Sequence, residues 1–231
     1  MTIGAILAGG RSTRFGDRDK AVVPLAGVPM VRRVADRLAG DDDPVPPGAD
    51  RAAGGDPVVD ELVINCRPDQ REAIAGALAG LSVSLRWAVD DEPDLGPVAG
   101  IRNACRTASG EYVAVVACDM PFVDPGFLAG LAGDAAGREA AIPRLNDRWL
   151  QTTQAVYRAE PMATACERAL DRGDRKVLAP IEDLDRVVVG DAEIRERTAE
   201  QTFTNVNTRA ELAAAETAIA EALAGPDADA R

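Results

Sequence analysis

The chain of 231 residues contains no histidine and only four cysteines. No two cysteines form a C-x-x-C pair, and no histidine is available to complete a common metal-ligand set. These absences argue against a structural zinc site. We therefore expect four reduced, small, buried thiols, as in a cytosolic protein, at Cys66, Cys105, Cys118 and Cys166.

Positive charge and long apolar runs are also scarce. The chain has 26 Lys and Arg against 38 Asp and Glu, a formal net charge of −12, which would repel a phosphate backbone. No apolar run approaches the length of a membrane span, and the apolar start at 3–8 stops at Gly9 and Gly10, too early for a signal peptide. The sequence therefore predicts a cytoplasmic protein with neither nucleic acid nor membrane as a partner.

Hydrophobic residues make up 46% of the chain, enough for a substantial core, and their pattern alternates between strand and helix. Buried strands are expected at 3–8, 61–66, 82–89 and 111–118, with less regular strands at 140–145 and 150–158. Helices are expected at 29–40, 69–81, 96–108, 161–173 and 209–225. This alternation predicts the α/β class, as a Rossmann-like three-layer α/β/α arrangement around a mostly parallel mixed sheet.

Residues 41–60 differ from this pattern. Pro, Gly and Asp dominate the segment, and it shows no apolar periodicity until its end. We expect a single domain over 1–231, with a disordered surface insertion at 41–60 and a flexible tail at 225–231.

A glycine-rich loop with basic residues follows the first strand. Exposed backbone N–H groups in such a loop are suited to phosphate. Neither common phosphate-loop pattern fits, because Asp17 follows Gly16 where the Walker A loop needs lysine, and Gly9 and Gly10 are adjacent. Only two lysines occur in the chain, and one of them, Lys20, lies in this loop.

Several segments resemble the molybdenum cofactor guanylyltransferases in family order. The stretch LAGGRSTRFGDRDK (7–20) is similar to the signature L-A-G-G-x-x-x-R-x-G-x-x-D-K, and FTNVNTRAEL (203–212) to the family's closing N-V-N-T-x-E-L. The segments PLAGVPMVRRV, VINCRPDQ, DDEPDLGPVAGI and ACDMPFVDPGFL between them are also similar. The stretch NDRWLQTTQAVY departs from the family's usual His/Pro-containing version. The resemblance implies a nucleotidyltransferase with a glycosyltransferase-A-like fold of the nucleotide-diphospho-sugar transferase type.

The implied reaction transfers GMP from GTP to the terminal phosphate of molybdenum-bound molybdopterin and releases pyrophosphate. Such a transfer needs charge neutralisation and in-line positioning more than covalent catalysis. A divalent ion, expected to be Mg²⁺, requires a carboxylate at the carboxyl end of a buried strand, and Asp119 holds that position. Arg14 and Lys20 would neutralise charge on the leaving pyrophosphate.

The resemblance also implies the remaining nucleotide contacts. Gly9 and Gly10 would offer backbone N–H groups to the phosphates, while Leu7 and Ala8 would flank the purine. Asn65, which ends its strand, is similar to a base- or ribose-contacting asparagine.

Further candidates lie later in the chain. The guanine edge needs a carboxylate, for which Asp90 and Asp91 are both candidates. Gly96 would let the next helix begin close to the nucleotide, and Asn205 and Asn207 would serve the acceptor phosphate or support the metal. Thr208 is expected to cap the last helix.

Alternative functions remain open on the residues alone. A relative could use CTP or another phosphorylated acceptor, and a nucleotide-binding regulator could have lost catalysis, although both Lys20 and Asp119 are retained. A sugar-nucleotide-forming enzyme usually has proline before the lysine, where this chain has Asp19. The family resemblance further implies transient contact with molybdenum cofactor biosynthesis or acceptor enzymes.

Overall fold

A computed structural model describes residues 2–10, 19–41, 59–92 and 95–224. The predicted catalytic Arg14, most of the expected insertion at 41–60 and the expected tail at 225–231 lie outside these ranges. Among the described helices, none is long and apolar enough to cross a membrane.

A mixed, mostly parallel sheet forms the centre of the fold, in the order β10-β7-β9-β6-β1-β4-β5. Strand β9 is antiparallel to both of its neighbours, β6 and β7, and the short β8 pairs with β7. The strands are β1 (Thr2–Leu7), β4 (Glu61–Cys66), β5 (Ser84–Val89), β6 (Tyr112–Ala117), β7 (Ala140–Leu145), β8 (Trp149–Leu150), β9 (Gln154–Arg158) and β10 (Arg186–Val189). This arrangement confirms the predicted class.

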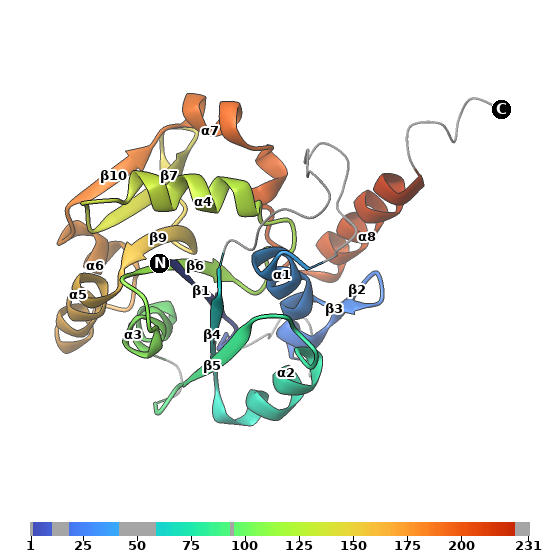
Figure 1. The fold of residues 1–231 in the computed structure, drawn as a ribbon, viewed down its shortest axis with the longest axis horizontal. Coiled ribbons are helices and arrows are strands. Elements are labelled where there is room, and N and C mark those ends of the chain that lie inside the picture. The colour runs from blue at the N-terminus through green and yellow to red at the C-terminus, as the bar shows by residue number, and fades with distance from the viewer. Residues whose placement is uncertain (1, 11–18, 42–58, 93–94, 225–231) are drawn as a thin grey trace.

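Helices cover both faces of the sheet, because side chains alternate between the faces along each buried strand. On one face, Ile6, Ile64 and Val116 point toward the helices α1 (Met30–Ala39), α2 (Arg71–Ala77), α4 (Pro125–Asp134) and α7 (Asp191–Arg197). On the other face, Ile3, Val63 and Val115 point toward the helices α3 (Pro97–Thr107), α5 (Ala159–Asp171) and α6 (Leu178–Glu182). The result is the three-layer arrangement seen in Figure 1.

A third, smaller apolar cluster packs residues near position 25 against the last described helix. Leu25 and Met30 pack there with Val206 and Ile219. The hairpin of β2 (Pro24–Leu25) and β3 (Val28–Pro29) therefore lies beside the last helix, α8 (Arg209–Ala224), as Figure 1 shows. Three short 3₁₀ turns also occur in the described ranges: η1 (Lys20–Val22), η2 (Pro68–Gln70) and η3 (Glu200–Phe203).

The sequence prediction was most accurate for the buried parallel strands and least accurate after residue 120. The strand expected at 150–158 is divided, because Leu150 pairs with β7 whereas 154–158 pairs with β6. The helix expected at 69–81 is shorter, ending at Ala77. Helix α4 was missed, although Asp124 followed by Pro125 signals its start: Asp124 Oδ1 accepts the N–H of Phe127 at 3.2 Å.

Candidate functional site

A cavity of about 480 Å³ lies at the carboxyl ends of the parallel strands β1, β4, β5 and β6. This is the edge at which open α/β sheets bind ligands. Most of the predicted site residues line it: Leu7, Ala8, Gly9, Gly10, Lys20, Asn65, Asp90, Gly96, Asp119 and Asn207. Two predicted residues, Asp91 and Asn205, do not line the cavity. Conversely, Glu92, Leu95 and Thr153 line the cavity but were not predicted from the sequence.

Backbone hydrogen bonds hold the strand ends together beside this cavity. The N–H of Cys118 donates to the carbonyl of Leu7 at 3.0 Å, and the N–H of Ala8 donates to the carbonyl of Asn65 at 2.8 Å. The pairing therefore extends one residue beyond β1 and β6 before the strands separate, and Gly9, Asn65 and Asp119 lie around one opening.

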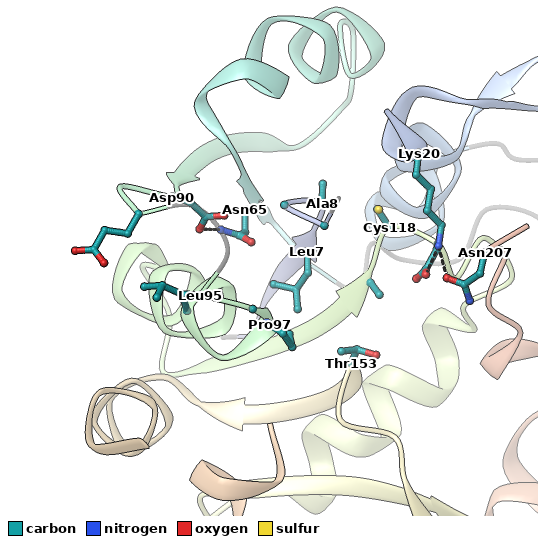
Figure 2. Close-up of a pocket in the computed structure, with 17 residues that line it drawn as sticks. Leu7, Ala8, Lys20, Asn65, Asp90, Leu95, Pro97, Cys118, Thr153 and Asn207 are labelled. Carbon is teal, nitrogen blue, oxygen red and sulfur yellow. Dashed lines mark hydrogen bonds and ion pairs between the residues drawn. The ribbon is translucent and has the colours of Figure 1, made fainter. Parts of the chain in front are cut away.

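Lys20 joins two acceptors at one end of the cavity. Its Nζ donates to Asp119 Oδ2 and to Asn207 Oδ1, the second at 2.6 Å (Figure 2). The Lys20 and Asp119 side chains are only 13% and 17% exposed, so water screens this ion pair weakly. The residue before Lys20, Asp19, caps η1 by accepting the N–H of Ala21 at 3.1 Å, which fixes the start of the lysine's turn.

The segment that precedes the last helix, α8, places Asn207 at this site. The carbonyl of Asp119 accepts the N–H of Val206 at 2.8 Å, so the segment before α8 lies directly against the end of β6. Glu211 then accepts the N–H of Asn207 at 2.6 Å, and Thr208 accepts the N–H of Glu211 at 3.2 Å. The hydrogen bond from Asn207 lowers the pKa of Glu211. Thr208 is thus the helix cap that the sequence predicted.

One oxygen of Asp119 is suited to a cation. Oδ1 is buried and has no hydrogen-bond partner among the described residues. A buried carboxylate oxygen without a partner is costly, and binding a hard cation would satisfy it. Within the described part of the chain, no three Cys, Asp or Glu side chains cluster to hold a metal by themselves.

Asp90 lies at the opposite end of the cavity, beside Asn65 (Figure 2), and two amides fix its carboxylate. Asn65 Nδ2 donates to Asp90 Oδ1 at 2.7 Å and to the carbonyl of Ala88 at 2.9 Å. Asn103 Nδ2, from α3, donates to the same Oδ1 at 3.0 Å. Both amides use Oδ1, which leaves Oδ2 as the less occupied oxygen. Sequence reasoning missed Asn103, since nothing in its helix pattern distinguishes it from a surface residue.

Two glycines are required where backbone approaches these polar groups. A Cβ on Gly9 would lie 2.7 Å from Asp90 Oδ2, and a Cβ on Gly100 would lie 2.5 Å from Asn65 Oδ1. Either substitution would displace the Asp90–Asn65 pair. Gly96 has φ of 78°, a conformation that side chains disfavour, and it directly precedes the first residue of α3.

The segment after β4 contacts the carbonyl side of the glycine loop. Arg67 Nη1 donates to the carbonyls of Gly9 and Gly10, each at 2.9 Å, and Gln70 Nε2 donates to the carbonyl of Ala8 at 3.0 Å. Neither side chain was selected from the sequence. Pro68, which begins the 3₁₀ turn between them, was the available signal that this segment is rigid.

The four cysteines are free and buried, in agreement with the sequence prediction. Burial raises the pKa of the Cys66 thiol to about 11 and that of Cys166 to about 12. Burial also raises the pKa of Cys118, which lines the cavity beside Asp119. These thiols stay protonated at neutral pH and are poor nucleophiles.

Known proteins resemble this chain over nearly its whole length. A relative from Natronomonas pharaonis, named a probable molybdenum cofactor guanylyltransferase, is 45% identical over 209 residues, covering 90% of this chain and 94% of its own. A relative of the same name from Haloferax mediterranei is 38% identical over 211 residues, covering 91% of each. The crystal structure of molybdopterin-guanine dinucleotide biosynthesis protein A from Archaeoglobus fulgidus superposes with a TM-score of 0.71 at 28% identity, covering 94% of this chain and 97% of that one.

The family model described as MobA-like NTP transferase domain matches residues 4–187. That range includes the glycine loop, Asp90 and Asp119, while Asn207 lies beyond it. The fold, the nucleotidyltransferase class and the family predicted from the sequence are confirmed, and the chain belongs to the MobA-like NTP transferase domain family.

Proposed function

We propose that this protein transfers GMP from GTP to the terminal phosphate of molybdenum-bound molybdopterin, forming molybdopterin guanine dinucleotide and pyrophosphate. One observation carries the proposal. A single cavity has a fixed carboxylate at one end, Asp90, and the Lys20–Asp119–Asn207 group at the other (Figure 2). A nucleotide with a donor-bearing base and a charged triphosphate complements these two ends.

Asp90 is the residue that we assign to the base. Guanine presents two adjacent donors, N1–H and N2–H₂, and a carboxylate accepts from both. Adenine presents an acceptor at N1, which the carboxylate would repel. Asn65 and Asn103 hold Oδ1, so Asp90 keeps one orientation. In this assignment Asn65 positions Asp90 as well as lining the cavity.

The glycine loop and Lys20 are assigned to the phosphates. Gly9 and Gly10 would supply backbone N–H donors, and Arg14 would supply a further positive charge. Without a ligand, the Lys20 ammonium is held by Asp119 and Asn207. An arriving phosphate oxygen offers a stronger anionic partner, so Lys20 would move onto the triphosphate and leave Asp119 available.

Asp119 is assigned to a divalent ion, which we propose is Mg²⁺, because Oδ1 is a buried hard oxygen with no hydrogen-bond partner among the described residues. When bound, such an ion neutralises charge on the triphosphate. Asn207, and Asn205 two residues before it, would position the acceptor phosphate. An oxygen of that phosphate attacks the α-phosphorus of GTP. The bond from this phosphorus to the bridging oxygen breaks, and pyrophosphate leaves with the electron pair.

The proposal is tested by incubating the full chain with Mg²⁺, molybdopterin and each of the four nucleoside triphosphates in turn. Pyrophosphate and the dinucleotide should form with GTP. Product with CTP instead would identify a cytidylyl transferase. Nucleotide binding without any product would identify a regulator.

Asp90→Asn, with Asp91→Asn as the matched control, tests the assignment of the base. Asparagine offers N1–H a weaker acceptor and places an N–H₂ group against a donor. We expect Asp90→Asn to lower kcat/KM for GTP by roughly tenfold or more, about 1.4 kcal/mol for each factor of ten. Asp91→Asn should leave it unchanged. Equal effects of the two substitutions would remove Asp90 from base recognition.

A further inference from the structure

The carbonyls of three successive residues in the glycine loop are held by side chains from one short segment. Gln70 donates to the Ala8 carbonyl, and a single nitrogen of Arg67 donates to the carbonyls of Gly9 and Gly10. Arg67 and Gln70 follow β4 and lie 57–62 positions after the loop residues whose carbonyls they bind, so these are tertiary contacts. Neither Arg67 nor Gln70 belongs to the set of residues that line the cavity.

Because peptide groups are planar, these contacts with the carbonyls also fix the direction of the neighbouring N–H groups. In a trans peptide, the carbonyl of one residue and the N–H of the next point in opposite directions. Holding the Ala8 and Gly9 carbonyls on the Arg67 side therefore directs the N–H groups of Gly9 and Gly10 away from it. Neither N–H donates a hydrogen bond to a described residue, whereas the N–H of Ala8 pairs with Asn65.

The two holding side chains are themselves fixed. Asp69 accepts from Arg67 Nε at 3.1 Å and from Nη2 at 3.2 Å, which leaves Nη1 for the glycine carbonyls. The Gln70 side chain accepts the N–H of Arg67 at 2.9 Å through its oxygen, so its nitrogen must face Ala8. Arg67 is only 15% exposed, whereas Asp69 is 70% exposed. The arginine is thus a largely buried support held by a surface carboxylate.

We infer that Arg67 and Gln70 are positioning residues for phosphate binding. They form a carbonyl clamp, defined as these two side chains on residues 8–10, which preorganises the Gly9 and Gly10 N–H groups as an anion-binding pair. The inference rests on the proposed nucleotide site. It assigns the clamp to the phosphates of the nucleoside triphosphate and not to the base, which Asp90 would contact.

This assignment has a diagnostic signature in nucleotide affinity. A clamp that orders phosphate donors should matter more as the number of phosphates rises. A merely structural contact should affect GMP, GDP and GTP alike, or should affect only the melting temperature. Preorganised amides bind an anion without the cost of ordering the loop, so loss of the clamp should appear as weaker binding.

The experiment measures the Kd of the full-length protein for GMP, GDP and GTP by calorimetry. The variants are Arg67→Ala, Arg67→Lys and Gln70→Glu. Gln70→Glu keeps the acceptor for the Arg67 N–H but removes the donor to Ala8. Arg71→Ala is the matched control, because it removes the same charge four residues away, where the guanidinium stacks on Trp87.

We expect Arg67→Ala and Gln70→Glu to weaken GTP binding by roughly tenfold or more, equivalent to about 1.4 kcal/mol. GDP should be intermediate, and GMP should change by less than about threefold. Arg67→Lys should recover most of the affinity, since both carbonyls bind one nitrogen of Arg67 and a single ammonium can reach them. Arg71→Ala should bind all three nucleotides as the wild type does.

Equal weakening of all three nucleotides, or unchanged GTP affinity in Gln70→Glu, would overturn the clamp. Should Arg67→Ala fail to fold, Arg67→Lys and Gln70→Glu still give the comparison. A wild-type protein that binds no GTP would instead overturn the proposed function. Wild-type binding with unaffected variants would overturn only the clamp.

Discussion

Lys20→Arg keeps the positive charge of the glycine loop and changes only its shape. In the structure one nitrogen of Lys20 contacts both Asp119 Oδ2 and Asn207 Oδ1. A compact ammonium at the end of a flexible chain can make both contacts and can then follow a phosphate oxygen. A guanidinium is wider, planar and suited to a two-pronged grip, so we expect it to fit less well in the space that the ammonium occupies between Asp119 and Asn207.

The expected loss follows from those two contacts. Replacing the single nitrogen forfeits at least one charge-assisted hydrogen bond, and such a bond contributes about 1.5–3 kcal/mol. If that contact forms with the phosphates during transfer, kcat/KM should fall by roughly tenfold to two-hundredfold, at 1.36 kcal/mol for each factor of ten. We expect a loss near the upper end of this range, roughly a hundredfold, because the site is only slightly exposed to water.

The assay is steady-state release of pyrophosphate with GTP, Mg²⁺ and molybdopterin. Lys176→Arg is the matched control, since it makes the same chemical change at the chain's other lysine, outside the cavity lining. Melting temperatures of both variants should stay close to that of the wild type. Retention of more than half of the wild-type kcat/KM by Lys20→Arg would refute the reasoning and leave only the charge as the requirement.

Asp119→Asn should abolish detectable turnover without unfolding the protein, because the amide keeps the shape but loses the charge for a hard cation. The loss should be about 3–5 kcal/mol in the transition state, and near-normal kcat at saturating Mg²⁺ would exclude the metal role. Deletion of residues 43–57 should leave turnover nearly intact, since their composition lacks apolar periodicity. A melting temperature lowered by more than about ten degrees, several kcal/mol for a domain of this size, would show that the segment is packed. A thiol reagent at pH 8 should label the native protein slowly, because burial raises the pKa of Cys66 to about 11, and should label all four cysteines after unfolding. Rapid labelling of the native chain would mean that the thiols are accessible.

The parallel strands were predictable because a strand buried on both faces is a nearly continuous run of apolar residues. The strand at 61–66 agrees with its predicted bounds, and the helix expected at 29–40 is present as α1, which Gly40 follows with φ of 77°. The region after residue 120 was less predictable, since its strands pair both parallel and antiparallel and one expected strand is divided between two partners. Position 150 joins one neighbour and position 154 another, a choice made by distant partners and not by local pattern.

For the site, the sequence by itself determined which chemical groups are present: a glycine pair, a rare lysine, and carboxylates at strand ends. It could not choose between Asp90 and Asp91, because adjacent residues carry identical side chains. The fold places only Asp90 in the cavity lining and fixes it through Asn103, which lies on a helix. It also brings Asn207 to Lys20 across 187 positions and holds the glycine carbonyls with Arg67. Such contacts depend on how strands and helices pack in three dimensions, because each joins residues far apart in the sequence, and local periodicity describes only neighbouring positions.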